Sequence, residues 1–321
     1  MRPHEDVPSF EVIRAATVLG EGPLWCDRRR ALLWIDGSRP QLLCWRYGAA
    51  AADVWPLERP PAALAHCHDG RLLIIFRSRF GVVDEPGAPV HELAIGDLLL
   101  GDERFNDAGV DPAGRLWVGT IDRALQRPLG ALRRIDAAGM KVMARGFVLS
   151  NGVGWSPDGR MMYFAETFGR RIHRFRFTSV TGCIEPTSLL ASIDSPSKPD
   201  GLAVDAEGGI WCAIFGAGRV HRYLPDGRLE RSLRLPASQL TSCAFGGPDL
   251  RTLYVTSATY GLSPEQAKRE PLAGCLFAVS MPVAGRLPTP LASENVLARA
   301  AASLSTQVLN KRDEPRTPSH A

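Results

Sequence analysis

The chain has 321 residues, of which 45% are hydrophobic and 22% are charged, with a formal net charge of +4 at pH 7. This composition is ordinary for a soluble globular protein, and the arginines are scattered, so neither a nucleic-acid nor a membrane-surface partner is expected. The length excludes a small scaffold and fits either two average domains or one large β-propeller or barrel.

The N-terminal sequence MRPHEDVPSF lacks the apolar core of a signal peptide. No stretch of the sequence approaches the roughly 18 apolar residues of a membrane span. The seven cysteines include no CxxC pair, and all except Cys183 lie in or beside apolar runs. They are therefore interpreted as buried thiols in a reducing compartment. We expect a cytoplasmic protein that is a monomer or a weak homo-oligomer.

Six short apolar strand cores recur along the chain, 40 to 48 residues apart. In order they read LWID, LIIF, LWVG, MYFA, IWCA and LYVT, beginning at residues 33, 73, 116, 162, 210 and 253. This spacing is about that of a four-stranded propeller blade. Each core follows a segment in which Gly or Asp supplies turn chemistry. The pattern predicts an all-β protein, a six-bladed β-propeller.

The two ends of the chain complete this prediction. The strand-like segment 10–19 is expected to join the blade that contains residues 274–281, which closes the ring and removes exposed sheet edges. Residues 1–287 would then form a single domain. The segment 288–321 is expected to be a C-terminal tail that is flexible or partly helical, with one helix in ENVLARAAASLSTQVL.

The repeats also share a position five residues before each turn. Counting back equally from the six turns gives Glu21, Ala62, Asn106, Asn151, Asp200 and Thr241. Four of these six carry a carboxylate or an amide. Because the inner strands of a propeller surround the channel, residues at the start of those strands should converge at one mouth. Such oxygen ligands suit Ca²⁺, Mg²⁺ or Mn²⁺, and Zn²⁺ also accepts them. On this interpretation Asn151 is a ligand, and Gly152 lets the backbone turn to present it.

Turn formation is the alternative interpretation of these pairs. Asn-Gly and Asp-Gly are common turn formers, so each pair taken alone is more often a turn than a ligand. Against this, EG, NG and DG occupy the same register in three repeats, while the hairpin turn follows a few residues later. Repeat symmetry by itself leaves both interpretations open.

Five segments resemble the gluconolactonase/regucalcin family, in the order that the family has them. They are GEGPLWCDRRRALLWID, RFNDAGVDPAGRLWVGTID, LSNGVGWSPDGRMMYFAET, KPDGLAVDAEGGIWCAIFGAGRVHRYLPDG and LTSCAFGGPDLRTLYVTSA, within residues 11–285. The resemblance implies a six-bladed propeller that binds one divalent metal (Ca, Zn, Mn or Mg) and hydrolyses sugar-acid lactones. The family's metal ligands fall on Glu21, Asn151 and Asp200, and its substrate-contacting residues fall on Arg104 and Asn106.

The chain departs from the family pattern in three places. Ala108-Gly109 follows RFND where Gly-Lys is frequent, and Glu166 stands where Asp is usual. The acidic residue that usually follows GTM is not clearly present in GTIDRALQ, where Asp122 is the nearest carboxylate. These departures leave the expected metal ligands intact and affect the expected substrate.

A metal-dependent mechanism is expected because the sequence contains no G-x-S-x-G motif and no Ser-His-Asp set. Asp200 is predicted to be both ligand and general base, while Arg104 and Asn106 bind the sugar. Two alternatives are a non-catalytic calcium-binding or ligand-sensing propeller and a pure interaction scaffold. The recurring tryptophans are expected to pack between blades rather than against a sugar.

Overall fold

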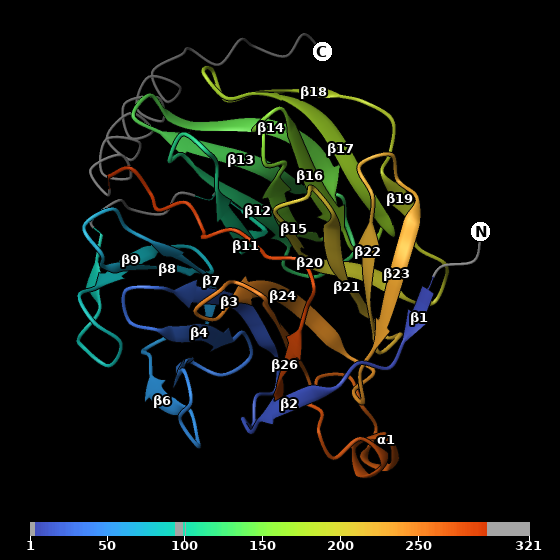
Figure 1. Cartoon of the computed structure of the whole chain (residues 1–321). Coiled ribbons are helices and arrows are strands. Elements are labelled where there is room, and N and C mark those ends of the chain that lie inside the picture. Colours follow the sequence, from blue (N-terminus) through green and yellow to red (C-terminus); the bar gives the residue numbers. More distant parts are fainter. Residues whose placement is uncertain (1–3, 94–98, 100, 294–321) are drawn as a thin grey trace, which may run out of the picture.

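The structure is a computed structural model that describes residues 4–93, 99 and 101–293. Its strands form six sheets arranged around a central axis, which confirms the six-bladed β-propeller (Figure 1). One helix, α1 (Pro264–Arg269), is found among the described residues. Ser263 caps it in a capping box with Gln266.

The first three blades are antiparallel sheets whose strands follow chain order. Blade 1 consists of β3 (Gly20–Cys26), β4 (Ala31–Asp36), β5 (Gln41–Arg46) and β6 (Asp53–Pro56). Blade 2 consists of β7 (Pro61–His66), β8 (Leu72–Phe76), β9 (Phe80–Val83) and β10 (His91–Glu92). Blade 3 consists of β11 (Glu103–Val110), β12 (Leu116–Asp122), β13 (Gly130–Asp136) and β14 (Gly139–Phe147).

The other three blades carry additional pairings. Blade 4 consists of β15 (Ser150–Trp155), β16 (Met161–Glu166), β17 (Arg171–Thr178) and β18 (Cys183–Pro186), with β19 (Ala191–Ser192) also paired to β17. Blade 5 consists of β20 (Lys198–Val204), β21 (Ile210–Phe215), β22 (Arg219–Tyr223) and β23 (Leu229–Arg234), to which β1 (His4–Asp6) adds in parallel. Blade 6 consists of β24 (Leu240–Gly246), β25 (Thr252–Ser257), β26 (Leu276–Ser280) and β2 (Phe10–Ile13).

The ring closes as the sequence predicts. β2, from the start of the chain, pairs antiparallel with β26, with Phe10 opposite Val279 and Ile13 opposite Leu276. The first strand of each blade contacts the first strands of its neighbours, so β3, β7, β11, β15, β20 and β24 surround the axis. The six apolar cores seen in the sequence lie in the second strands, one position further out.

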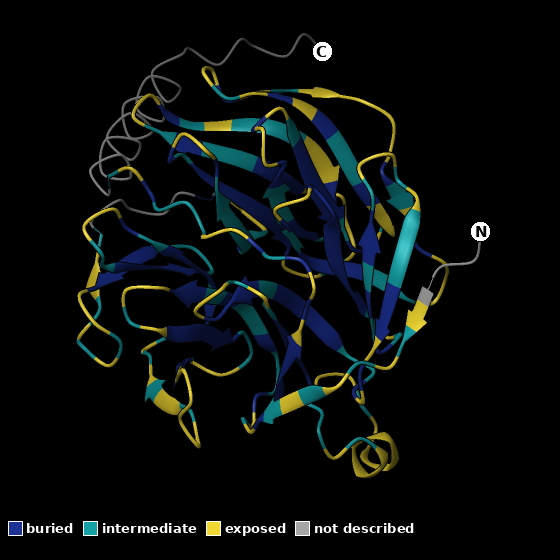
Figure 2. Ribbon diagram, in the orientation of Figure 1, coloured by how far each residue is buried: buried dark blue, intermediate teal, exposed yellow. Residues whose placement is uncertain are grey.

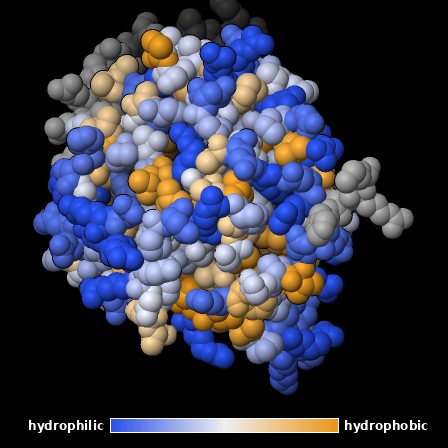
Figure 3. Space-filling view, viewed as in Figure 1, coloured by the Kyte–Doolittle hydropathy of each residue, from blue (hydrophilic) through white to orange (hydrophobic). Residues whose placement is uncertain are grey.

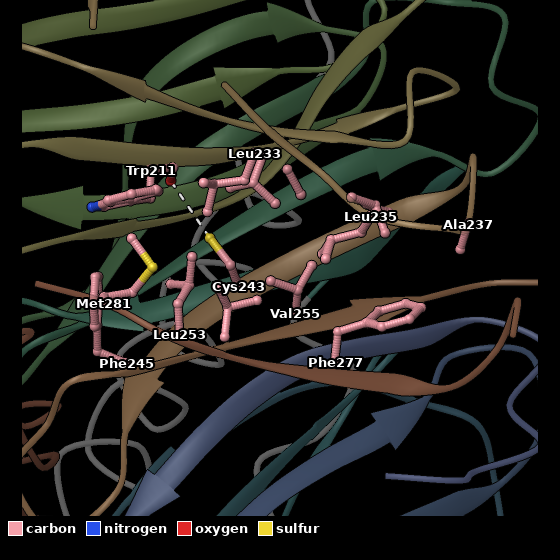
Figure 4. Close-up of a cluster of buried hydrophobic side chains, with 14 of the residues drawn as sticks. Trp211, Leu233, Leu235, Ala237, Cys243, Phe245, Leu253, Val255, Phe277 and Met281 are labelled. Carbon is pink, nitrogen blue, oxygen red and sulfur yellow. Dashed lines mark hydrogen bonds between the residues drawn. The ribbon is translucent and has the colours of Figure 1, made fainter. Parts of the chain in front are cut away.

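Each second strand is buried because it packs between two neighbouring blades. β4, β8 and β12 are buried along their whole length, and Figure 2 shows the dark buried strands inside a yellow rim of exposed loops. Figure 4 shows the cluster where blades 5 and 6 meet, with Trp211, Leu235 and Phe277 in contact with its other members. The tryptophans at recurring positions are all buried, as predicted: Trp25, Trp34, Trp117, Trp155 and Trp211.

Two of these tryptophans explain why Asp begins the preceding turn. Asp111 accepts a hydrogen bond from the Trp117 indole at 2.9 Å, and Asp205 accepts the equivalent bond from Trp211 at 2.8 Å. The second oxygen of each carboxylate accepts backbone N–H groups of the turn. A single buried carboxylate therefore ties the turn to the strand that follows it.

The segment 282–293, which we call the strap, crosses one mouth of the channel (Figure 1, orange to red). Residues 284, 285, 286, 291 and 292 hydrogen-bond the turns between the first and second strands of blades 5, 6, 4, 2 and 3, in that order. The backbone partners are Ala206, Leu250, Ser156, His66 and Gly114. Leu291 is fully buried and bridges to Cys67. The expected tail thus begins with residues packed on the propeller, and the expected helix lies outside the described residues.

The remaining expectations from the sequence concern the burial of the cysteines, the polarity of the surface and membrane spans. Six cysteines are buried and Cys183 is exposed, and none forms a disulfide within the described residues. On the face seen in Figure 3, hydrophilic residues predominate and hydrophobic ones form only small groups. The part of the chain that the structure describes has no helix with the length and hydropathy of a membrane span.

Candidate active site

A β-bulge interrupts the innermost strand of every blade at the register position found in the sequence. In β15 the pairing with β16 shifts between Ser150 and Val153, which leaves Asn151 and Gly152 outside the ladder. Equivalent shifts in four other inner strands leave Ala62, Asn106, Asp200 and Thr241 outside the ladder. In β3 the shift begins directly after Glu21, which still pairs with Ile35. Because bulges re-aim side chains, they explain how residues within strands can point along the channel. The Asn-Gly pair is therefore part of a strand, and the turn interpretation is wrong here.

Gly152 has a different role from the one expected. It does not adopt a positive φ, so it does not turn the chain. A Cβ at this position would lie 2.5 Å from Leu202 N and 2.8 Å from Asp200 O. Glycine is required because β15 and β20 approach each other closely. That approach brings Asn151 beside Asp200.

All five predicted site residues line one cavity of about 240 Å³ at the channel mouth opposite the strap. They are Glu21, Arg104, Asn106, Asn151 and Asp200. A second cavity, of about 220 Å³, lies at the strap end and includes residues of the strap in its lining. Asp107 lines both cavities and therefore lies between them. Of the other two register positions, Ala62 lines the site cavity, while Thr241 is turned to Gly20 and Thr256.

The two asparagines form a connected amide network. Asn106 Nδ2 donates to Asn151 Oδ1 at 3.0 Å and to Ser150 O at 2.9 Å. Asn151 Nδ2 donates to Thr167 Oγ1 at 2.9 Å. Both N–H groups of Asn106 are thereby used, so only its oxygen remains for a ligand. The network fixes the Asn151 amide with its oxygen on the side of Asn106.

Three carboxylates face this end of the channel with raised pKa values. Burial, followed by the charges of Asp200 and Asp107, raises the pKa of Glu21 well above its ordinary value. Burial and then Asp107 raise the pKa of Asp200, against smaller opposing effects from Gly201, Asn151 and Lys198. Burial raises the pKa of Asp107 to about 6. Like charges held together out of water favour the protonated forms, or a bound cation.

The donor set fits a hard divalent cation. Asp200 Oδ1 is buried without a hydrogen-bond partner among the described residues, which is the state expected of an oxygen that awaits a ligand. Glu21 and Asn151 would supply the other oxygens. Within the described ranges, no three His, Cys, Asp or Glu side chains cluster as a metal site by themselves. The predicted set contains only two such residues, since its third member is an amide.

Sequence reasoning missed several residues of this cavity, of which Asp107, Thr167, Arg77 and Lys198 matter most for its chemistry. Asp107 is the second residue released by the bulge in β11, so a count of one position per blade passes over it. Thr167 follows β16 and is found only through its contact with Asn151. Arg77 and Lys198 also line the cavity. The Lys198 ammonium lies 4.5 Å from the centroid of the Phe168 ring.

The departures from the family pattern lie away from the predicted ligands. Ala108 and Gly109 line the cavity at the strap end. Glu166 contacts His173 Nε2 at 2.8 Å. Asp122 accepts backbone N–H groups of Gln126 and Arg127 and does not line the site cavity.

Residues 19–259 match the model of the SMP-30/Gluconolactonase/LRE-like region. The chain belongs to this family. A relative from Pseudomonas putida, named 6-deoxy-6-sulfogluconolactonase, is 36% identical over 279 residues, covering 85% of this chain and 95% of the relative. Regucalcin of Gallus gallus is 31% identical, covering 85% of this chain and 95% of its own length.

A solved structure of a family member gives the same architecture. The calcium-binding protein regucalcin from Agrobacterium tumefaciens superposes with a TM-score of 0.84 at 27% identity, covering 90% of this chain and 99% of that one. The SMP-30/gluconolactonase family therefore accounts for both the sequence segments and the propeller.

Proposed function

We propose that this protein hydrolyses sugar lactones to the corresponding sugar acids, using one divalent cation held by Glu21, Asn151 and Asp200. The observation that carries the proposal is that the five residues inferred from the sequence line one cavity. The names of the relatives support lactone chemistry, and the Pseudomonas putida protein is named for a sulfonated lactone. The calcium-binding relative supports a divalent cation.

Each residue has a defined task in this reaction. When bound, the cation would polarise the lactone carbonyl or acidify a water molecule. Asp200 would accept the proton of the attacking water. Arg104 would donate N–H groups to the sugar through its planar fork. The amide oxygen of Asn106 would accept a hydrogen bond from a sugar hydroxyl, while its N–H groups donate to Asn151 and Ser150.

The test is lactonase activity of the Asp200→Asn variant. We expect the variant to lose activity by about 100-fold or more, because it lacks both the base and a charged ligand. Proton release from a panel of aldonolactones measures this, with chelated protein reloaded with Ca²⁺, Mg²⁺, Mn²⁺ or Zn²⁺. Asp226→Asn, an exposed turn carboxylate of the same blade, is the matched control and should retain full activity.

Two outcomes would overturn the proposal. If the wild-type protein hydrolyses no lactone but binds the cation at this site, the non-catalytic calcium-binding or ligand-sensing alternative is correct. If Asp200→Asn hydrolyses lactones at the wild-type rate, the assignment of Asp200 is wrong.

A further inference from the structure

Arg77 lines the site cavity, the one that also contains Glu21, Asn151 and Asp200, and it lies where three blades meet. It directly follows β8, and its Nη2 donates to Gly37 O in blade 1 at 2.9 Å. Its carbonyl accepts the Phe105 N–H of blade 3 at 2.8 Å. These backbone contacts hold the base of the side chain, and the residue lines the same cavity as Arg104, Asp200 and Glu21.

The positive charges of Arg77 and Arg104 are not compensated by protein carboxylates. Within the described ranges, neither side chain forms an ion pair. Arg77 Nε is buried without a hydrogen-bond partner among these residues. Arg104 makes one long contact, from Nη1 to Phe105 O at 3.4 Å. Most of the N–H donors of both guanidinium groups therefore lack a protein acceptor.

The positive charges of the two arginines also repel each other. Burial, then the charge of Arg77, then that of Arg123 lowers the pKa of Arg104 to about 10. Two like charges held near each other in a desolvated cavity are unfavourable unless an anion joins them. The sugar hydroxyls of a neutral lactone would not offset this repulsion.

Two other arginines that are buried or half-buried, Arg222 and Arg133, have carboxylate partners. Arg222 contacts the carboxylates of Asp205 and Glu230, and Arg133 pairs with Glu103 at 2.6 Å. Lys198 is the third cation that lines the site cavity. Its ammonium lies over the Phe168 ring, and its charge offsets part of the rise in the pKa of Asp200 that burial causes. Unlike Arg222 and Arg133, Arg77 and Arg104 have no carboxylate partner among the described residues.

We propose that Arg77 and Arg104 form an anion subsite, and that the substrate is a sugar lactone with an anionic substituent remote from its carbonyl. This inference rests on the proposed lactonase function. A sulfonate, phosphate or carboxylate shares the required chemistry, since planar guanidinium groups bind such oxygens in pairs. The carboxylates of Glu21, Asp107 and Asp200 would repel the anion, which orients the lactone with its charged end toward Arg77.

Matched lactones test the subsite: gluconolactone, its 6-phosphate, its 6-deoxy-6-sulfonate and the corresponding 6-carboxylate. We expect wild-type kcat/KM to be at least about 10-fold higher for one of the charged lactones than for gluconolactone. The Arg77→Gln variant keeps a donor for Gly37 O but removes the charge. It should lower kcat/KM for the charged lactone by about 10- to 100-fold, mainly through KM, and change gluconolactone by less than about 3-fold.

Arg79→Gln is the matched control, because this nearby arginine contacts Glu92 and does not line the cavity. It should leave every kcat/KM unchanged. Arg77→Lys, which retains the charge, should recover part of the preference. A wild-type preference for gluconolactone, or an equal loss on all lactones in Arg77→Gln, would overturn the anion subsite.

Calorimetric binding separates this inference from the lactonase proposal. The probes are gluconate and 6-phosphogluconate, which need no turnover. We expect tighter binding of 6-phosphogluconate by wild-type protein and loss of that difference in Arg77→Gln. If no lactone is hydrolysed but this difference is found, the lactonase proposal fails and the anion subsite stands. If lactones are hydrolysed but Arg77→Gln binds both acids as the wild type does, the subsite fails alone.

Discussion

Thr167 and Asn106 together fix the orientation of the Asn151 amide. The Thr167 hydroxyl accepts a hydrogen bond from Asn151 Nδ2 at 2.9 Å, and both of these residues are buried. An unsupported amide could rotate and present nitrogen instead of oxygen to a cation. Outer contacts of this kind typically change metal affinity or activity by about 10- to 100-fold when removed.

We therefore predict that Thr167→Val lowers cation affinity and kcat by about 10-fold or more, while the propeller stays folded. Competition with a chelator measures the affinity, and circular dichroism checks the fold. Thr167→Ser retains the hydroxyl and should be close to wild type. Equal affinity in Thr167→Val and the wild type would show that the hydroxyl has no part in the site.

At the same scale, the sequence predicts those site residues that repeat with the blades. Glu21, Asn106, Asn151 and Asp200 share one register position, so the repeat reveals their convergence without coordinates. Asp107 and Arg77 do not follow that periodicity. The first is the extra residue of a bulge, and the second depends on how the start of a loop is held by Gly37 and Phe105. Such contacts depend on tertiary packing, which a single sequence does not encode locally.

Two kinds of element position the site and close the channel. The bulged inner strands expose ligand oxygens at one mouth, and the strap covers the other. Sequence periodicity predicts the strands, because burial between blades requires apolar cores at regular intervals. The strap carries no such repeat, and its three prolines and its small residues resemble a tail. Its structure follows from hydrogen bonds to turns of five blades.

The strap should contribute measurably to stability through Leu291. This side chain is fully buried in a cluster with Ala65, Cys67 and Leu116. We predict that Leu291→Ala lowers the free energy of unfolding by about 2–5 kcal/mol, the usual range for a buried leucine. Leu287→Ala, at a residue of the same strap that is 51% exposed, should change it by about 0.5 kcal/mol or less. Urea unfolding measures both, and equal effects would show that the strap does not pack as described.

At the scale of the whole molecule, the propeller concentrates charge on its axis. Three inner strands bring Glu21, Asp107 and Asp200 to one region of the channel, and their raised pKa values show that ionising them together is unfavourable. Below the ordinary pKa values, folded and unfolded chains are both protonated at these groups. As the pH rises, the unfolded chain ionises first, so the metal-free protein loses stability from about pH 4 until the raised values are passed.

A bound cation should reverse this loss, because it neutralises the carboxylates only in the folded state. The Asp200→Asn substitution removes one charge from the same region. It should therefore stabilise the metal-free protein at pH 8 and weaken its response to the cation. Binding of a cation elsewhere on the surface would act on the wild type and the variant alike.

The most direct measurement is the Tm of metal-free wild-type and Asp200→Asn protein at pH 8, with and without each of Ca²⁺, Mg²⁺, Mn²⁺ and Zn²⁺. For at least one cation, at about 100 times its Kd, we predict a rise of about 5 °C in the wild type and little or none in Asp200→Asn. The metal-free variant should also melt at a higher temperature than the metal-free wild type. Equal shifts in the two proteins, or no shift with any cation, would contradict a metal site at Asp200.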